Sequence, residues 1–455
     1  MVTIEFCGAA KTVTGSNYLI KTDSATFVVD CGMFQGKDVE HYNLEELVYD
    51  ASKVDFALLT HSHIDHSGML PKLTKAGFIG PIYATSETIQ ISTELLLDSA
   101  KLQENAYQRG EFYGKYTQKR ALVYNTKDSL GTISMFKVVN FDQPFEPMPG
   151  IKVKYIVAGH ILGAASIEVE ILDSDGTTKK IIFSGDIGRL QSPLIKTFDT
   201  SYSATPEYVI MESLYGGEYH ADRNESTKQL LQIINDTVKR GGNVFIPCFA
   251  VQRAQELLND MKFAKADGIL DTDLPVYLDS PLAQRVTDIY SRALDSSSQN
   301  LFDFPNLIYV KKYKQSVQLT KKTGQVILAG SGMADGGRIV DHLTIGLENP
   351  RNSVIFVGFQ AEGTLGRQLV EGAKKVVIGT KTINVNANVQ QLEGFSAHGD
   401  TNDYTSWIKR FTNSNLKKIF LIHAEIDRAE ALKKHFEGLG IMQNYIPSMK
   451  ETVTL

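Results

Sequence analysis

The sequence predicts an α/β protein in which one domain interrupts another. The first 65 residues form a run of short strand-like segments, whereas strands and helical stretches alternate after about residue 215. Such alternation is typical of a parallel sheet with crossover helices. The last 75 residues return to strand, helix and strand, with no linker rich in Pro, Gly or Ser. We therefore expect a first domain part over 1–214, an inserted domain over 215–380 and a final part over 381–455.

The individual elements follow from local patterns. β-branched or aromatic segments bounded by Gly, Asp or Ser predict strands, and apolar residues at helical spacing predict helices. In the first part we expect strands over 2–6, 16–22, 25–32, 54–61, 151–159, 166–172 and 179–186, and helices within 67–77 and 87–108. In the inserted domain we expect strands over 243–250, 275–280, 326–332 and 353–359. In the final part we expect a strand over 381–394, a helix over 401–411 and a strand over 416–425.

Composition excludes several classes of protein. With 455 residues, 42% hydrophobic and 22% charged, the chain can bury a sizeable core. No apolar run approaches the roughly 20 residues that a membrane span needs. Three scattered cysteines, Cys7, Cys31 and Cys248, favour a reducing cytoplasm over a disulfide-stapled fold. The net charge of -5 excludes a protein that coats nucleic acid through bulk positive charge.

Two segments differ from this background. Residues 101–120 carry five basic and two acidic side chains with interleaved aromatic residues, and residues 311–322 carry five lysines and no acid. Each could line a nucleic-acid groove, but a solvated helix face explains such runs more often. We give both segments little weight.

The strongest chemical signal is the run His61-Ser62-His63-Ile64-Asp65-His66, directly after an apolar strand. Four of these six residues are metal-ligand types, a density that chance seldom produces. In an extended segment His61 and His63 point the same way and can reach one ion, while Asp65 and His66 turn toward a second. Imidazole combined with carboxylate suits zinc. The alternative is a histidine-rich loop satisfied by hydrogen bonds.

A dinuclear site needs ligands from elsewhere in the chain. His160, Asp186 and His423 each lie at the end of an expected strand, where loops collect ligands. Singly, each would more often be a core or surface residue. Together with the 61–66 run, they complete two coordination shells.

The motifs carry a family resemblance. HSHIDH, AGHILGAAS and FSGDIG resemble the phosphodiesterase branch of the metallo-β-lactamase fold. MESLYGG, CFAVQRAQELL, YLDSPLA, GSGMADGGR, VGFQAEGTLGRQL, GFSAHGD and IHAE resemble its β-CASP subgroup. Within that subgroup, GAAKTVTGSNYL and HSGMLPKL resemble bacterial ribonucleases related to the endonuclease subunit of eukaryotic pre-mRNA 3′-end cleavage. The resemblance implies an αββα sandwich interrupted by an inserted parallel-sheet α/β domain.

The resemblance also implies roles for residues. One zinc ion would be held by His61, His63 and His160 and the second by Asp65, His66 and His423, with Asp186 bridging. Asp30 would support a ligand histidine, although an Asp that caps the turn before Gly32 is an alternative. The expected catalytic residues are Asp65, His398 and Glu212; His398 would protonate the leaving 3′-oxygen and Glu212 would keep it protonated.

Ser331, Arg253 and Arg367 are expected phosphate contacts, although the arginines could instead hold domains together. Three departures from the family pattern leave the shape of the groove open: Gln252 replaces a common Gly, Gly399 replaces a common Ala, and SLYGG replaces STYG. None of them removes a ligand.

The expected function is a zinc-dependent ribonuclease that leaves a 5′-phosphate and a 3′-hydroxyl on single-stranded RNA. It would act as an endonuclease, with 5′-to-3′ exonuclease activity as an addition, in the cytoplasm, without a membrane and with a homodimer as one possible state. The alternatives are a DNA-directed β-CASP nuclease, a non-catalytic RNA-processing scaffold, and a small-molecule hydrolase or flavodiiron-type oxidoreductase on the same fold. His423 favours RNA because DNA-processing members of the subgroup typically have an apolar residue there.

Overall fold

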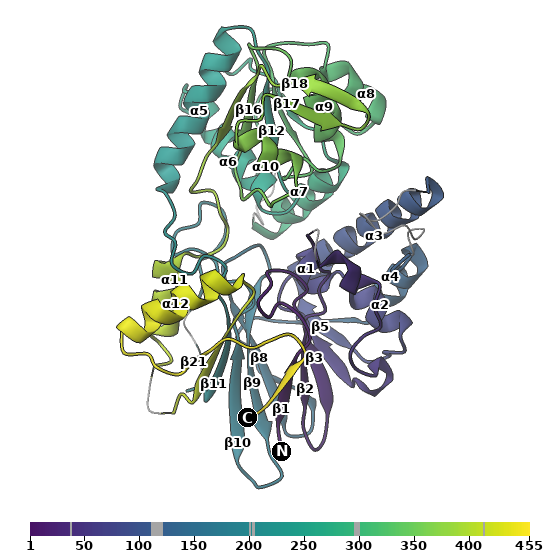
Figure 1. Ribbon diagram of the computed structural model, residues 1–455, viewed down its shortest axis with the longest axis vertical. Coiled ribbons are helices and arrows are strands. Elements are labelled where there is room, and N and C mark those ends of the chain that lie inside the picture. The colour runs from purple at the N-terminus through teal and green to yellow at the C-terminus, as the bar shows by residue number, and fades with distance from the viewer. Residues whose placement is uncertain (37–38, 111–121, 200–201, 203–204, 295–300, 413–414) are drawn as a thin grey trace. The chain divides into compact units, whose positions relative to one another are not determined.

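A computed structural model describes residues 1–36, 39–110, 122–199, 202, 205–294, 301–412 and 415–455. The chain divides into two compact units (Figure 1). Unit 1 combines Met1–Tyr219 with His398–Leu455, and unit 2 is His220–Ala397. Unit 2 is therefore an insertion within unit 1.

Unit 1 contains two seven-stranded sheets. The first has the order β22-β1-β2-β3-β4-β5-β6 and the second the order β21-β20-β11-β10-β9-β8-β7. The strands of the first sheet are β1 (Thr3–Phe6), β2 (Tyr18–Lys21), β3 (Thr26–Val29), β4 (Phe56–Leu58), β5 (Ile82–Thr85), β6 (Phe136–Val139) and β22 (Glu451–Thr454). Those of the second are β7 (Phe145–Met148), β8 (Ile151–Val157), β9 (Ala165–Leu172), β10 (Thr178–Phe183), β11 (Tyr208–Glu212), β20 (Lys418–Ile422) and β21 (Asn444–Tyr445).

Helices cover the outer face of each sheet (Figure 1). Helices α1–α4 lie over the first sheet, and α11 and α12 over the second. Their bounds are α1 (Ile64–Ser67), α2 (Leu70–Lys75), α3 (Ser86–Gln108), α4 (Thr126–Ile133), α11 (Thr401–Ile408) and α12 (Ile426–Gly438), with short 3₁₀ turns at Glu40–Asn43 and Ala51–Lys53.

Strand periodicity explains this layering. In β11, Tyr208 and Ile210 belong to the core between the two sheets, whereas Val209 and Met211 belong to the core under α11 and α12. Successive side chains of a strand point to opposite faces, so a continuously apolar strand can serve two cores. Unit 1 is thus the predicted αββα sandwich.

Unit 2 is built around a six-stranded sheet of order β14-β13-β15-β12-β16-β19, in which every pairing is parallel. Its strands are β12 (Val244–Pro247), β13 (Val276–Leu278), β14 (Leu307–Tyr309), β15 (Val326–Ala329), β16 (Ser353–Phe356) and β19 (Asn388–Gln391), beside a hairpin of β17 (Lys375–Ile378) and β18 (Lys381–Asn384). Its helices are α5 (Arg223–Lys239), α6 (Arg253–Ala266), α7 (Pro281–Leu294), α8 (Tyr313–Leu319), α9 (Arg338–Gly346) and α10 (Leu365–Val370). The parallel sheet with crossover helices agrees with the predicted fold class.

The end of the inserted region differs from the boundary expected at 380. The segment 381–394 forms β18 and β19 rather than one strand, and β19 pairs with β16 through the register from Ser353↔Asn388 to Phe356↔Gln391. These strands belong to unit 2, which continues to Ala397. Local patterning indicates strand character but does not determine which sheet a strand joins.

Two further sequence predictions concern the charged segments and the cysteines. Residues 111–120 of the first charged segment lie outside the described residues, whereas the five lysines of 311–322 are all exposed. Cys7, Cys31 and Cys248 are buried free thiols. Among the described residues, every helix is too short or too polar to cross a membrane.

Candidate metal centre

The ligand-rich run folds at the junction between β4 and α1. His63 is the residue before helix α1, and Asp65 and His66 lie in the first turn of that helix. The separation of the run into two directions therefore arises because the chain turns into a helix at Ile64, not from the alternation of an extended segment.

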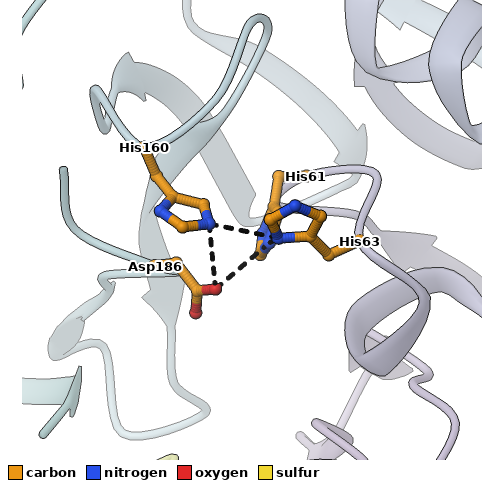
Figure 2. Close-up of side chains that lie close together, drawn as sticks. All are labelled: His61, His63, His160 and Asp186. Carbon is orange, nitrogen blue, oxygen red and sulfur yellow. Dashed lines mark hydrogen bonds and ion pairs between the residues drawn. The ribbon is translucent and has the colours of Figure 1, made fainter. Parts of the chain in front are cut away.

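One group of ligand atoms comprises His61, His63, His160 and Asp186 (Figure 2). Asp186 Oδ2 lies 3.2 Å from His61 Nε2 and 3.4 Å from His160 Nε2. His63 Nδ1 lies 3.1 Å from each of those two nitrogens. All four ligand atoms lie within 4.8 Å of one another.

A second group comprises Asp65, His66 and His423. His423 Nε2 lies 3.3 Å from Asp65 Oδ2. The other oxygen of Asp186, Oδ1, lies 3.1 Å from His66 Nε2 and 3.7 Å from His423 Nε2. Asp186 thus turns one carboxylate oxygen toward each group.

The hydrogen bonding of these groups tests whether they suit metal ions. Asp186 Oδ1 is buried and makes no hydrogen bond of good geometry with any described residue, although two imidazoles lie close to it. His63 Nδ1 faces two other ring nitrogens, and a neutral imidazole has only one N–H to share. Buried polar atoms normally have hydrogen-bond partners. Because several of these atoms converge without such partners, the cluster fits a shared metal ion better than a loop satisfied by hydrogen bonds.

The charge states agree with that fit. Burial, assisted by neighbouring imidazoles, lowers the pKa of His61, His63 and His160, and that of His63 falls to about 3. Burial alone would raise the pKa of Asp186, but His423, His66 and His61 hold it well below its usual range. His61, His63 and His160 are thus neutral imidazoles beside an ionised carboxylate, the donor set that zinc prefers. Burial would also lower the pKa of His66 and His423, but Asp186 raises it, so these two rings would release a proton on binding an ion.

Asp30 contacts His66, one of the candidate ligands. Its Oδ2 lies 2.7 Å from His66 Nδ1, and its two oxygens accept hydrogen bonds of 2.8 Å from the backbone N–H and the hydroxyl of Thr60. Asp30 has a positive φ of 58°, which directs the chain out of β3 at this point. A carboxylate in this position fixes the orientation and tautomer of the His66 ring.

His398 and Glu212 lie together beside the first group. His398 Nδ1 lies 3.2 Å from Glu212 Oε2 and 3.9 Å from Asp186 Oδ2. Burial would lower the pKa of His398, but the charges of Glu212 and Asp186 outweigh it and raise this pKa to about 9. Asp186, Glu212 and His398 also form a third group of atoms within 4.8 Å.

The local sequence explains the position of His398. His398 lies two residues before Asp400, the N-cap residue of helix α11. The backbone N–H of Asp400 donates to the Asp403 carboxylate, and the backbone N–H of Asp403 donates to the Asp400 carboxylate. At Gly399, a Cβ atom would lie 2.8 Å from Asp403 Cβ and 3.0 Å from the Gly188 carbonyl oxygen. The glycine that departs from the family pattern therefore fits a tight contact.

Sequence reasoning missed three contributors. The Tyr404 hydroxyl donates to Glu212 Oε2 over 2.6 Å, Thr60 holds Asp30, and Ser16 Oγ lies 3.3 Å from His66 Nε2. Thr60 directly precedes His61, which could have drawn attention to it. Tyr404 offers no signal beyond its place in an amphipathic helix.

The expected phosphate contacts lie in unit 2, and each has an acidic neighbour. The Ser331 hydroxyl donates to Asp335 over 2.5 Å. The guanidinium groups of Arg253 and Arg367 pair with Glu256 at 2.5 Å and Glu371 at 2.6 Å. The arginine charges are thus partly neutralised by acidic residues three and four positions further along the chain.

Three family models match successive parts of the chain. Residues 11–191 match the metallo-beta-lactamase superfamily, 254–369 the Beta-Casp domain, and 382–447 the Zn-dependent metallo-hydrolase RNA specificity domain. The chain is 34% identical to ribonuclease TTHA0252 of Thermus thermophilus over 94% of both proteins. The chain belongs to the β-CASP branch of the metallo-β-lactamase superfamily.

Other β-CASP relatives carry different names. Identity is 30% to transcription termination factor FttA of Methanocaldococcus jannaschii, over 98% of this chain and 70% of that protein. It is also 30% to probable RNase MJ4 of the same organism, over 94% and 95% of the two chains. A solved Enterococcus faecalis protein of unknown function aligns over the full length of both chains with a TM-score of 0.56 and 14% identity, which supports the fold alone.

Family membership confirms the resemblance and the fold class predicted from the motifs. Together with the clustered imidazoles and carboxylates, it makes this β-CASP protein a metal-dependent hydrolase.

Proposed function

We propose that this β-CASP protein is a ribonuclease that hydrolyses phosphodiester bonds of single-stranded RNA with two zinc ions. The observation that carries the proposal is the division of Asp186 between two ligand groups, with Oδ2 near His61 and Oδ1 near His66. Relatives named as ribonucleases support RNA as the substrate. Three buried free thiols favour a reducing cytoplasm as its location.

Each ligand would have a defined task. His61, His63 and His160 would hold one ion, Asp65, His66 and His423 the other, and Asp186 would lie between them. Two such ions supply an activated water and neutralise charge that grows on the phosphate oxygens. Asp30 would keep Nε2 of His66 directed at its ion by binding Nδ1.

His398 would protonate the leaving 3′-oxygen. Because its Nδ1 lies against Glu212, the opposite ring nitrogen, Nε2, remains to donate the proton. Tyr404 and the Ile187 backbone N–H both donate to Glu212, which fixes the carboxylate that orients the imidazole. The products would be a 5′-phosphate and a 3′-hydroxyl, formed by internal cleavage with 5′-to-3′ exonuclease activity as an addition.

The proposal is tested with zinc-loaded protein and matched RNA and DNA oligonucleotides of one sequence. We expect RNA cleavage, with products that lose a 5′-phosphate to phosphatase, and no comparable DNA cleavage. The H63A variant should remain folded and lose cleavage. Preferential DNA cleavage would favour the DNA-directed alternative, and unchanged cleavage by H63A would remove the metal centre from the reaction.

The scaffold alternative is less well supported. Non-catalytic paralogues typically lose ligands, whereas all seven expected ligands are present here and their atoms form compact groups. A folded wild-type protein that binds RNA and zinc but cuts neither RNA nor DNA would revive this alternative.

A further inference from the structure

Three loops of unit 2 meet at one edge of its parallel sheet. They comprise residues 248–252, 330–337 and 357–364, and they follow the adjacent strands β12, β15 and β16. Ligands of open α/β sheets bind at this carboxyl edge, because the loops there leave the sheet in the same direction. Apart from Ser331, a predicted phosphate contact in the second of these loops, the proposed reaction in unit 1 assigns no role to this edge.

Two of these loops expose phenylalanines. Phe249 is 45% exposed and Phe359 is 59% exposed. Among the described residues, Phe263 on helix α6 is the other phenylalanine with such exposure, at 57%. Large aromatic side chains are usually buried. Two exposed rings on neighbouring loops of a ligand-binding edge therefore indicate a binding surface.

The backbone beneath both rings is held in place. A Cβ atom at Gly332 would lie 2.8 Å from two carbons of the Phe249 ring, so the ring lies directly on this glycine. Gln360, which is 2% exposed, donates from Nε2 to the carbonyl oxygens of Gly332, Gly358 and Phe359 over 3.0–3.2 Å. One buried amide thus joins the loop of Phe359 to the loop on which Phe249 lies.

Bare backbone surrounds the rings. A Cβ atom at Gly336 or Gly358 would have no atom within 4 Å, and one at Gly330 would meet only the Cys248 carbonyl oxygen at 3.7 Å. Glycines with open space beside them leave the backbone accessible to a close-lying ligand. The edge therefore combines flat apolar rings with accessible peptide groups.

We infer that Phe249 and Phe359 form a base-stacking platform for single-stranded RNA. This inference rests on the proposed function and adds to it a means of holding the strand in unit 2. Every base has a flat face, so aromatic rings bind single strands with little sequence preference. Stacking on one ring is worth about 5- to 150-fold in affinity. A protein segment is the competing occupant, and the experiment below distinguishes it.

Binding is measured first, by fluorescence anisotropy of a labelled single-stranded RNA with zinc-loaded protein. We expect F249A and F359A each to weaken binding by about 5- to 150-fold, and F249W and F359W to restore it. The control F263A removes an equally exposed ring of the same unit and should bind like wild type. Zinc content and the unfolding midpoint of each variant verify that it is folded.

Abasic RNA then separates stacking from other causes. Ribose without a base is placed at one position at a time along the same sequence. At one or more positions the abasic substitution should weaken wild-type binding and leave the alanine variant unaffected. Steady-state cleavage should give a raised KM with kcat within about twofold of wild type.

Several results would overturn the inference. The inference fails if the F249A/F359A double variant binds RNA with wild-type affinity, or if F263A loses as much affinity as F249A and F359A. It also fails if the alanine variants bind more weakly than wild type whichever position of the RNA is abasic. Failure of wild type to bind single-stranded RNA would also overturn it and would leave a protein segment as the occupant. If wild type binds RNA but does not cut it, the proposed function fails while the platform remains supported.

Discussion

Each unit contains a buried aspartate surrounded by histidine and other polar groups, and the two differ in how those groups are satisfied. In unit 2, Asp279 Oδ1 accepts from Arg338 over 2.5 Å, and its Oδ2 accepts from Ser316 and lies 2.7 Å from His342 Nε2. In unit 1, Asp186 Oδ1 is buried without a well-formed hydrogen bond to any described residue. Similar residue types therefore form a network closed around both carboxylate oxygens of the aspartate in unit 2, and in unit 1 one that leaves a carboxylate oxygen without a hydrogen-bond partner among the described residues. Complementarity, more than residue identity, distinguishes a metal centre from a structural cluster.

The largest expected effect comes from removing the shared carboxylate of unit 1. D186A should lower ribonuclease activity by about three orders of magnitude or more, since both ions lose a ligand and the proposed site loses its bridge. Bound zinc, measured by elemental analysis, should fall together with activity. The control D175A removes an exposed aspartate of the same unit and should change neither quantity. If D186A kept its zinc and its activity, the incomplete cluster would not be a metal centre.

Substitution of His398 tests whether this residue of unit 1 acts as a general acid or as a metal ligand. H398A should lower kcat by about 10²- to 10⁴-fold, the usual contribution of a general acid, while both zinc ions remain bound. Y404F should have a smaller effect in the same direction, since it removes one of the bonds that fix Glu212. Zinc content and single-turnover rates provide the measurement. Loss of an ion from H398A would instead assign His398 to the third group, as a metal ligand.

Breaking the closed network should affect stability and leave chemistry intact. D279N leaves the Arg338 guanidinium without its buried counter-charge, which should cost about 3–5 kcal/mol of unfolding free energy. Hydrogen exchange should increase in β13 and α9, and zinc content should not change. Retention of wild-type stability would show that Asp279 is not the centre of the network.

The lowered pKa of Asp279 also predicts that the free energy of unfolding depends on pH. Burial by itself would raise its pKa, but His342, Ser316 and Arg338 hold this pKa below the usual value. A group whose folded pKa is depressed contributes stability above its unfolded pKa of about 3.9, and this stability is lost as pH falls through the folded pKa. Urea unfolding at pH 7, 5 and 3.5 should therefore show a steeper loss below pH 4 for wild type than for D279N. Parallel curves would contradict the assignment.

The fold class and the clustering of the candidate ligand residues could be predicted because both depend on local patterns. Strand periodicity reveals layers, and strand ends collect side chains such as His160 and Asp186 at one place. The sheet that β19 joins could not be predicted, because strand pairing is decided by distant partners. The pairings of Arg253 with Glu256 and Arg367 with Glu371 could have been predicted, since residues three and four apart meet on a helix.

Gln252 illustrates a residue whose cost depends on its neighbours. It has a positive φ of 64°, which explains why a glycine is common at this position. Its buried amide donates to Glu256 Oε1 and accepts from the Tyr290 hydroxyl, each over 2.8 Å. Q252A should lose both bonds while keeping the strained backbone, at a cost of about 2 kcal/mol. Q252G loses the same bonds but relieves the strain, so it should be about 1 kcal/mol more stable than Q252A in urea unfolding. Equal stability of the two variants would mean that strain at this position is negligible.

The smallest expected effect concerns the exposed lysines of residues 311–322. None of the five forms an ion pair with a described residue. The protein is nevertheless acidic overall, so its phosphate binding should come mainly from the metal ions. The salt dependence of RNA binding should therefore be shallow, at about −0.7 in log–log slope for each of a few neutralised phosphates. A variant with glutamine at Lys311, Lys312 and Lys314 should shift this slope by less than about 0.7, one phosphate equivalent, in anisotropy titrations from 50 to 200 mM salt. A shift of about 2, the equivalent of three phosphates, would mean that these lysines bind the RNA backbone directly. Affinity for the strand would then come from unit 2 through charge as well as through stacking, and the contrast between a reactive unit 1 and a closed unit 2 would apply only to their buried clusters.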